Sequence, residues 1–242
     1  MSTPEVRCAA LLLAAGRGRR FDPTGHQDKL LQHVQSECMA VQGPSIEAVQ
    51  ASPVLPAQAS SVVPAQASSI VAARACASLA AGSDAVLAVV RPQAPIALQQ
   101  ALREAGACVT VCEDADLGMG HSLAHAVREA RARWPHLQAL LVMPADMPWV
   151  QPASVQAVAQ ALVQVTGAQP ACGIVVPVTP TGQRGHPVGF DARHFDALAA
   201  LQGDAGARHL LQSAAVERLM LEDPGIVRDV DTAQDLSPTA RT

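Results

Sequence analysis

The sequence predicts an α/β protein with a mostly parallel sheet that is covered by helices on both faces. Short apolar runs have the length of buried strands, and they lie at 6–13, 85–90, 108–112, 139–143 and 173–176. Segments with a helical pattern alternate with them, at 69–81, 94–105, 120–133 and 152–165. The length of 242 residues and the 49% share of hydrophobic residues suit a single domain, 1–242, with a large core.

Each predicted strand and helix fits its place in this alternation. The first strand, VRCAALLL, is apolar at most positions and runs directly into a glycine-rich stretch. The later strands, AVLAVV, CVTVC, ALLVM and GIVV, are equally short and apolar, and a helical segment precedes each of them. A helix between consecutive strands is the connection that parallel pairing requires. Since ligands of such sheets bind beyond the carboxyl ends of the strands, the loops after Leu13, Cys112 and Met143 are predicted to share one ligand-binding rim.

One stretch interrupts the alternation. Residues 54–69 read VLPAQASSVVPAQASS, a tandem repeat within a segment rich in Pro, Ser, Gln and Ala. Repeated prolines in a low-complexity sequence do not pack into a core. We therefore expect a flexible surface insertion at about 36–66 without a chemical role.

Composition excludes several classes of function. A net charge of −4 and an aromatic share of 2% argue against a nucleic-acid-binding protein. No apolar run is long enough to cross a bilayer. The basic residues near the N-terminus follow the apolar run, whereas in a signal peptide they precede it. The six cysteines are scattered without a C-x-x-C pair, as expected for reduced core residues, so we expect a cytoplasmic protein with no membrane partner.

The first rim loop, LLLAAGRGRRFDPTGHQDKLL (11–31), has features of a phosphate-binding loop. It lacks the Gly-Lys-Ser/Thr ending of a P-loop and the third glycine of a dinucleotide-binding fingerprint. Glycine at 16 and 18 lets backbone N–H groups approach phosphates. Arg17, Arg19, Arg20 and Lys29 supply positive charge. The alternative reading is a basic loop exposed to solvent.

An aspartate directly follows the strand at 139–143, in the sequence LLVMPADMPWV. Asp146 would thus place a carboxylate on the same rim as the glycine-rich loop. A turn or cap before the next helix is the alternative role. Beside a phosphate-binding loop, a hard oxygen ligand for Mg²⁺ is the stronger prediction.

These residues resemble the nucleotidyltransferases of molybdenum cofactor maturation, and most closely their cytidylyltransferase branch. The resemblance begins with L-A-A-G-x-G-x-R at 13–20, followed by Lys29 and by the D-M-P turn at 146–148. It continues in order through LGMGHSLAHAV (117–127), GQRGHPVGF (182–190), LQGDAGARHLL (201–211) and RDVDTAQDL (228–236). It covers the chain except for about 35–66, and it implies a three-layer, Rossmann-like fold of the nucleotide-diphospho-sugar transferase type.

The resemblance also implies a reaction and a set of site residues. A terminal phosphate of molybdopterin would attack the α-phosphorus of CTP, with Mg²⁺ as cofactor and pyrophosphate as the leaving group. The catalytic residues it implies are Arg20, Lys29 and Asp146. The nucleotide would be bound by Leu13, Ala14, Ala15, Gly16, Gly18, Arg20 and Lys29. The acceptor would be bound by Gly120, Ser122, His186 and Arg208. The metal ligands would be Asp146 and Asp231, although a capping role for Asp231 stays open.

The sequence is also compatible with other functions. The same fold type could use another nucleoside triphosphate or a sugar-phosphate acceptor, could hold a flavin or nicotinamide as a reductase, or could carry finished cofactor without turnover. A recipient molybdoenzyme or its maturation chaperone is the expected protein partner. His121 and His125 have the spacing of a zinc site, but the glutamate of that motif is absent and a metal role is rejected. Asp204 is expected to cap the helix that carries Arg208.

Overall fold

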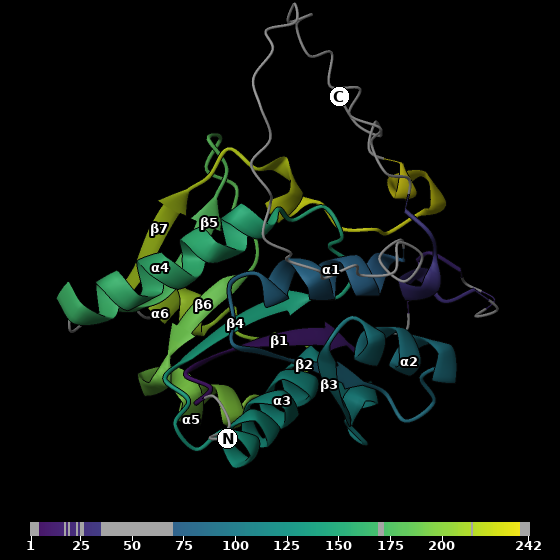
Figure 1. The fold of residues 1–242 in the computed structure, drawn as a ribbon, viewed down its shortest axis with the longest axis horizontal. Coiled ribbons are helices and arrows are strands. Elements are labelled where there is room, and N and C mark those ends of the chain that lie inside the picture. Colours follow the sequence, from purple (N-terminus) through teal and green to yellow (C-terminus); the bar gives the residue numbers. More distant parts are fainter. Residues whose placement is uncertain are drawn as a thin grey trace, which may run out of the picture.

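The computed structural model describes residues 5–16, 18, 20–22, 24, 27–34, 70–168, 172–213 and 215–237. The predicted insertion at 36–66 and its repeat lie outside the described residues, as do Arg17, Arg19 and Cys38. In the described part of the chain, seven strands form one sheet in the order β3-β2-β1-β4-β6-β5-β7 (Figure 1). They are β1 (Cys8–Ala14), β2 (Ala85–Val90), β3 (Ala107–Val111), β4 (Ala139–Pro144), β5 (Cys172–Val178), β6 (Val188–Asp191) and β7 (Ala215–Met220).

The sheet is mostly parallel, as predicted. Strands β1, β2, β3 and β4 pair in parallel, and so do β5 and β7. Strand β6 is antiparallel to both β4 and β5, so that all five predicted strands run in one direction. Two strands were missed. Strand β6 is too short to give a pattern, and the edge strand β7 is half exposed and carries Glu217 and Arg218.

All four predicted helices are present with slightly different ends. The helices are α1 (Val71–Ala80), α2 (Ile96–Glu104), α3 (Met119–Arg133), α4 (Pro152–Ala168), α5 (Phe195–Ala199) and α6 (Leu210–Ser213). Short 3-10 turns are η1 (Lys29–Leu31), η3 (Ala115–Leu117), η4 (Ala192–His194), η5 (Pro224–Val227) and η6 (Ala233–Leu236). Helices α1, α2 and α4 lie on one face of the sheet, while α3 and α5 lie on the other (Figure 1).

Two apolar cores separate these layers, and alternation along the central strand β1 supplies both. Ala10, Leu12 and Ala14 are buried beneath α1 and α4, whereas Ala9 and Leu11 are buried against α3. A strand that is covered on both faces has no polar side, which explains the uninterrupted apolar run in the sequence. The second strand β2 alternates in the same way, with Val90 on one face and Val89 on the other.

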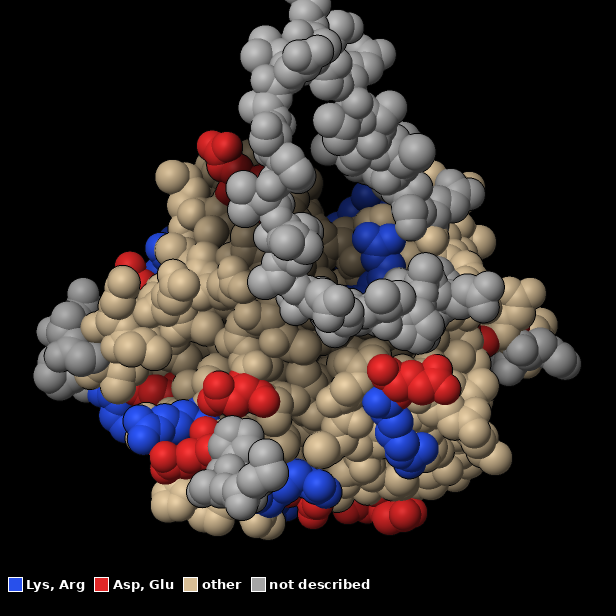
Figure 2. Space-filling model, in the orientation of Figure 1, with Lys and Arg blue, Asp and Glu red and all other residues tan. Residues whose placement is uncertain are grey.

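The described residues contain no helix that is both long and apolar enough to span a bilayer. Basic and acidic side chains are interspersed over the face in Figure 2, and the described residues form no continuous basic surface on it. All five described cysteines have free thiols, and Cys76, Cys112 and Cys172 are buried.

Candidate active site

Three adjoining cavities open along the predicted rim, and Met119 and Pro144 line all three. The central cavity, about 720 Å³, contains Arg20, Lys29, Asp146, Asp229 and Asp231. The loop cavity, about 400 Å³, lies beside Ala15 and Gly16. The apolar cavity, about 380 Å³, includes Val142, Val176, Phe190 and Leu211. The shared residues place the three cavities side by side, and together they are called the groove.

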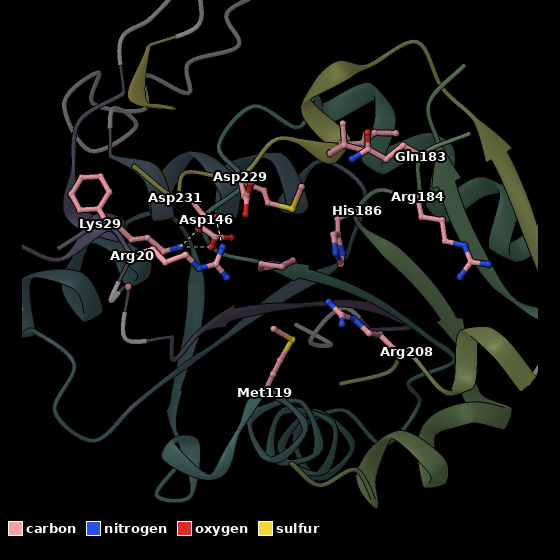
Figure 3. A pocket seen from close by; sticks show the side chains of 16 residues that line it. Arg20, Lys29, Met119, Asp146, Gln183, Arg184, His186, Arg208, Asp229 and Asp231 are labelled. Carbon is pink, nitrogen blue, oxygen red and sulfur yellow. Dashed lines mark hydrogen bonds and ion pairs between the residues drawn. The ribbon is translucent and has the colours of Figure 1, made fainter. Parts of the chain in front are cut away.

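Lys29 is the centre of an ion-pair cluster in the central cavity (Figure 3). Its Nζ lies 2.5 Å from Asp146 Oδ2 and 3.8 Å from Asp231 Oδ1. The same ammonium donates a hydrogen bond to the Val230 carbonyl at 3.1 Å. Only 12% of the Lys29 side chain and 20% of the Asp146 side chain are exposed, so water screens this pair weakly.

Arg20 pairs with the other carboxylate of the cluster. Its NH1 atom lies 2.5 Å from Asp231 Oδ2, and its side chain is 82% exposed. Figure 3 shows Arg20 and Lys29 converging on Asp146 and Asp231 at one end of the cavity. The sequence therefore predicted correctly that the two cations and two carboxylates lie together, although they come from distant parts of the chain.

Local contacts hold the two acidic segments against each other. The N–H of Val230 donates to the carbonyl of Asp146 at 2.8 Å, which joins the segment after β7 (221–237, the C-terminal segment) to the loop after β4. Buried Asp223 strengthens this junction, because its carboxylate accepts hydrogen bonds from Ser154 Oγ at 2.6 Å and from the N–H groups of Gln151 and Gly225. Figure 3 shows Asp146 and Asp231 side by side as a result.

Neither aspartate caps a helix, although Asp146 does lie in a turn after β4. The N-cap of η6 is Thr232, which forms a capping box with Asp235, while the Asp231 carboxylate faces Arg20 and Lys29. The Asp146 carboxylate likewise bonds to Lys29, six residues before α4 begins at Pro152. Both carboxylates are thus directed into the cavity.

Two titratable groups in the central cavity have shifted pKa values. Burial raises the pKa of Asp229, and the negative charges of Asp231 and Asp146 raise it further, while Lys29 opposes the shift. Burial lowers the pKa of His186, and a hydrogen bond from Nδ1 to the Val142 carbonyl and the charge of Asp146 oppose that shift. Burial therefore favours the neutral form of the His186 imidazole.

The donor set around Lys29 fits a hard divalent cation. In the described residues, no group of three or more His, Cys, Asp or Glu side chains is close enough to hold a metal. Mg²⁺, however, is commonly bound by one or two carboxylates together with water and substrate phosphates. Asp146, Asp231 and the Val230 carbonyl already surround one positive charge, the Lys29 ammonium. These oxygens are of the type that a hard divalent cation binds together with water and phosphate oxygens.

The loop cavity joins the glycine-rich loop to the start of α3. Leu13, Ala15 and Gly16 line one side, and Gly118 and Ser122 line the other. Ser122 was predicted on the acceptor side, but it does not line the cavities that contain His186 and Arg208. Ala14 is fully buried in the core and lines none of the three cavities, so its side chain lies outside the site.

His186 and Arg208 lie together, as their common predicted role requires. Both line the central and the apolar cavities, together with Arg184. Figure 3 shows them to one side of the cluster formed by Arg20, Lys29, Asp146 and Asp231. The groove thus has a charged end beside the glycine-rich loop and a largely apolar end beyond His186.

Gly120 differs from its predicted role. Its N–H donates to the Gly203 carbonyl at 2.7 Å, and a Cβ at this position would lie 2.7 Å from the Gln202 carbonyl oxygen. Gly120 is buried and lines none of the three cavities, so it is a packing glycine and its amide is not available to an acceptor. Asp204 also differs: it precedes a turn, not a helix, and its side chain lines the loop and apolar cavities.

The two histidines that were rejected as a zinc site have separate partners. His121 Nδ1 accepts a hydrogen bond from the Gly203 N–H at 3.1 Å. His125 Nε2 lies 3.0 Å from Thr110 Oγ1. His121 therefore attaches the loop at 202–204 to the start of α3.

Sequence reasoning missed two charged residues, Asp229 in the central cavity and Arg91 next to the site. Asp229 was noted only as part of a motif, although it is the third carboxylate of the central cavity. Arg91 directly follows the predicted strand at 85–90 on the same rim, and that position was the signal that could have identified it. In the structure, Arg91 NH1 donates to the Gly16 carbonyl at 2.8 Å.

Comparisons with known proteins agree with this architecture. The family described as "MobA-like NTP transferase domain" matches residues 62–219. The purine catabolism protein PucB of Bacillus subtilis (strain 168) is 27% identical over 134 residues, which are 54% of this chain and 60% of that protein's length. The crystal structure of Rv0371c from Mycobacterium tuberculosis H37Rv in complex with manganese is 26% identical, with 95% of each chain covered and a TM-score of 0.58. A nucleotidyl transferase from Methanothermobacter shares the fold at 19% identity, with 95% of this chain and 94% of that chain covered and a TM-score of 0.62.

Proposed function

The chain belongs to the MobA-like NTP transferase domain family, and from this premise we propose that it transfers a cytidylyl group from CTP to molybdopterin and releases pyrophosphate. The observation that carries the proposal is the cluster in which Arg20 and Lys29 meet Asp146 and Asp231. It lies in a cavity that also contains Gly18 of the glycine-rich loop. A nucleotidyltransferase needs cations for the triphosphate and carboxylates for a metal in one place.

The nucleoside would occupy the loop cavity. Ala15 and Gly16 line it from the end of β1, and Asp146 connects it to the central cavity where the triphosphate would lie. A Cβ at Gly16 would meet no atom within 4 Å, so the space beside this backbone is open to a ligand. Ser122 adds a hydroxyl group, which makes it a nucleotide-side contact in this proposal. The Ala15 methyl group narrows the same space and favours a pyrimidine over a purine.

Asp146 and Asp231 would hold Mg²⁺, with Val230 contributing its carbonyl oxygen. The manganese complex of a relative that is 26% identical supports the use of a divalent cation. When bound, such an ion would supply positive charge that offsets the negative charge of the phosphates. Lys29 and Arg20 already lie beside these carboxylates, so both can pair with phosphate oxygens next to the metal.

The transfer itself is an in-line substitution at phosphorus. An oxygen of the acceptor phosphate forms a bond to the α-phosphorus of CTP. The bond from that phosphorus to the bridging oxygen breaks, and pyrophosphate leaves with the bonding electrons. Arg20 and Lys29 offset the negative charge that builds up on the leaving group, since catalysis of such reactions depends on positioning and charge neutralisation. The imidazole of His186 and the guanidinium of Arg208 would orient the acceptor where the central cavity meets the apolar cavity.

The acceptor body would occupy the apolar cavity. Phe190 and Leu211 provide apolar walls, while Arg208 and Arg184 can pair with an anionic group at the junction with the central cavity. A flat ring system that carries a terminal phosphate meets both requirements. A recipient molybdoenzyme or its maturation chaperone would then take up the dinucleotide product.

The decisive experiment measures pyrophosphate release with each of CTP, GTP, ATP and UTP, with and without molybdopterin. We expect release with Mg²⁺ that depends on the acceptor and is fastest with CTP. A preference for GTP would contradict the cytidylyl assignment. Release with CTP and a sugar phosphate, but not with molybdopterin, would contradict the acceptor. Absence of release with every nucleotide would refute the transferase, and yellow protein or binding of finished cofactor would then indicate a reductase or a carrier.

A further inference from the structure

Arg91 lies behind the site and contacts two of its parts at once. It follows β2 directly and does not line the central cavity or the loop cavity. Its NH1 atom donates to the Gly16 carbonyl at 2.8 Å, and its NH2 atom lies 3.3 Å from Asp28 Oδ2. The side chains of Arg91 and Asp28 are only 17% and 12% exposed, so their ion pair is largely shielded from water.

The two partners of Arg91 stand at opposite ends of the glycine-rich loop. Gly16 begins the loop and lines the loop cavity. Asp28 ends it and is the N-cap of η1, because its Oδ1 accepts the N–H of Leu30 at 3.0 Å. Lys29, the first residue of η1, extends into the central cavity and pairs with Asp146. One planar guanidinium group therefore connects the nucleoside side of the groove to the lysine of the charged cluster.

We propose that Arg91 is a positioning residue that links Gly16 to the Asp28 cap of η1 and so holds the surface formed by Gly16 and Lys29 in place before the nucleotide binds. The inference rests on the proposed function, since it assigns this surface to a nucleoside triphosphate. Arg91, which lines neither the central nor the loop cavity, donates to the Gly16 carbonyl oxygen. The partial negative charge of this oxygen is therefore already paired with a cation when the phosphates bind. Binding groups that are held in place before the ligand arrives cost less conformational entropy on binding.

Arginine is suited to this role because its rigid fork can bond a carbonyl and a carboxylate at the same time. The Lys29 ammonium has other partners, Asp146 and the Val230 carbonyl, and these hold its tip but not the loop. Without Arg91, the Gly16 carbonyl would lose this partner, and the Asp28 cap would lose its counter-ion. Nucleotide binding should then weaken, whereas the groups that act on the transferred phosphorus remain in place.

The test compares Arg91→Ala with Arg91→Lys and with the control Arg103→Ala, which removes an exposed arginine of α2 that bonds Gln99. We expect Arg91→Ala to raise KM for the nucleotide about tenfold, which corresponds to about 1.4 kcal/mol, with a much smaller change in kcat. Arg91→Lys should restore part of the affinity, because an ammonium can reach one of the two partners. Arg103→Ala should leave both constants unchanged.

Two further measurements need no turnover. Equilibrium binding of CTP should weaken by the same factor in Arg91→Ala. Amide hydrogen exchange of the ligand-free protein should accelerate at Leu30 and Leu31, whose N–H groups bond to Asp28, and not in α3. The exchange result stands even if the wild-type protein releases no pyrophosphate, so failure of the proposed function and failure of this inference can be told apart.

Several outcomes would overturn the inference. Wild-type KM and wild-type exchange in Arg91→Ala would show that the bridge has no effect on the surface formed by Gly16 and Lys29. A loss confined to kcat would indicate that Arg91 acts on the transition state. Faster exchange throughout the sheet would indicate that Arg91 serves general stability. Double substitution with Asp28→Asn, which keeps a good N-cap, should cost less than the sum of the two single effects; full additivity would also contradict the bridge.

Discussion

Replacing Asp146 by asparagine separates the chemical role of its carboxylate from its structural role. The amide has the same size but no charge, so it is a poor ligand for Mg²⁺ and a weaker partner for Lys29. Lys29 would still have Asp231 at 3.8 Å, the Val230 carbonyl at 3.1 Å and the new amide oxygen. The ammonium therefore does not become an uncompensated buried charge, a situation that costs about 3–5 kcal/mol.

Asp146→Asn should therefore have a small effect on the free energy of folding and a large effect on kcat. Weakening one charged hydrogen bond should cost about 1–2 kcal/mol of folding free energy, which corresponds to a fall in Tm of about 2–8 °C for a chain of this size. Loss of preorganised charge at the reacting phosphates should lower kcat by a factor of about 10²–10³. Activity should therefore fall far more than stability.

The assay measures pyrophosphate release at saturating nucleotide over a range of Mg²⁺ concentrations, with Tm measured on the same samples. Binding of Mn²⁺, followed by electron paramagnetic resonance, reports on the metal site without turnover. The matched control is Asp196→Asn, which neutralises an exposed carboxylate on α5 that pairs with Arg131. Near-normal turnover of Asp146→Asn with an unchanged requirement for metal would refute the assignment. Unfolding of the variant below room temperature would refute the estimate of its structural role.

Three other substitutions test separate parts of the structure. Ala15→Gly should reduce the ratio of kcat/KM for CTP to that for GTP about tenfold, because the methyl group narrows the loop cavity; an unchanged ratio would remove Ala15 from base selection. Asp223→Ala should lower the free energy of unfolding in urea by about 3 kcal/mol or more, since the buried Gly225 N–H and Ser154 hydroxyl and the partly buried Gln151 N–H lose their acceptor, whereas Asp223→Asn should cost less; equal costs would contradict this. His186→Asn should make the free energy of unfolding fall less steeply as the pH is lowered. Burial lowers the pKa of His186 below 6.5 in the folded protein, so the stability that the neutral imidazole contributes is complete above pH 6.5 and is lost as the pH falls toward the pKa of the folded state. Urea unfolding at pH 7.5 and 5.5 measures this slope, and identical slopes in both proteins would refute it.

Stability and chemistry are linked in this site through the C-terminal segment. Asp231 and Val230 are placed by backbone contacts to the loop after β4, and Asp223 supports that junction from inside. The Arg228 guanidinium stacks on Trp149 at 4.6 Å from the ring centroid, which adds a second contact between the same segments. A substitution that loosens the junction should therefore reduce metal binding as well as folding free energy.

Local patterns identified most of the fold. The five apolar runs became strands that run in one direction, and the four helical segments became helices, because burial on both faces leaves a composition that is visible within a few residues. The antiparallel strand β6 escaped detection. It has four residues, and its pairing with β4 and β5 depends on partners that lie far away in the chain.

The sequence alone also determined which residue types meet at the rim. A glycine-rich loop after one strand and an aspartate after another must lie at the same edge of a parallel sheet, and Gly16 and Asp146 do line one cavity. Only the tertiary structure decided which individual residues meet. Ser122 lines the same cavity as Ala15, and Gly120 packs on Gly203. Asp231 pairs with Arg20, and Arg91 bridges Gly16 and Asp28. Strand order and close packing set these distances between remote residues, and neither is encoded in a short stretch of the chain.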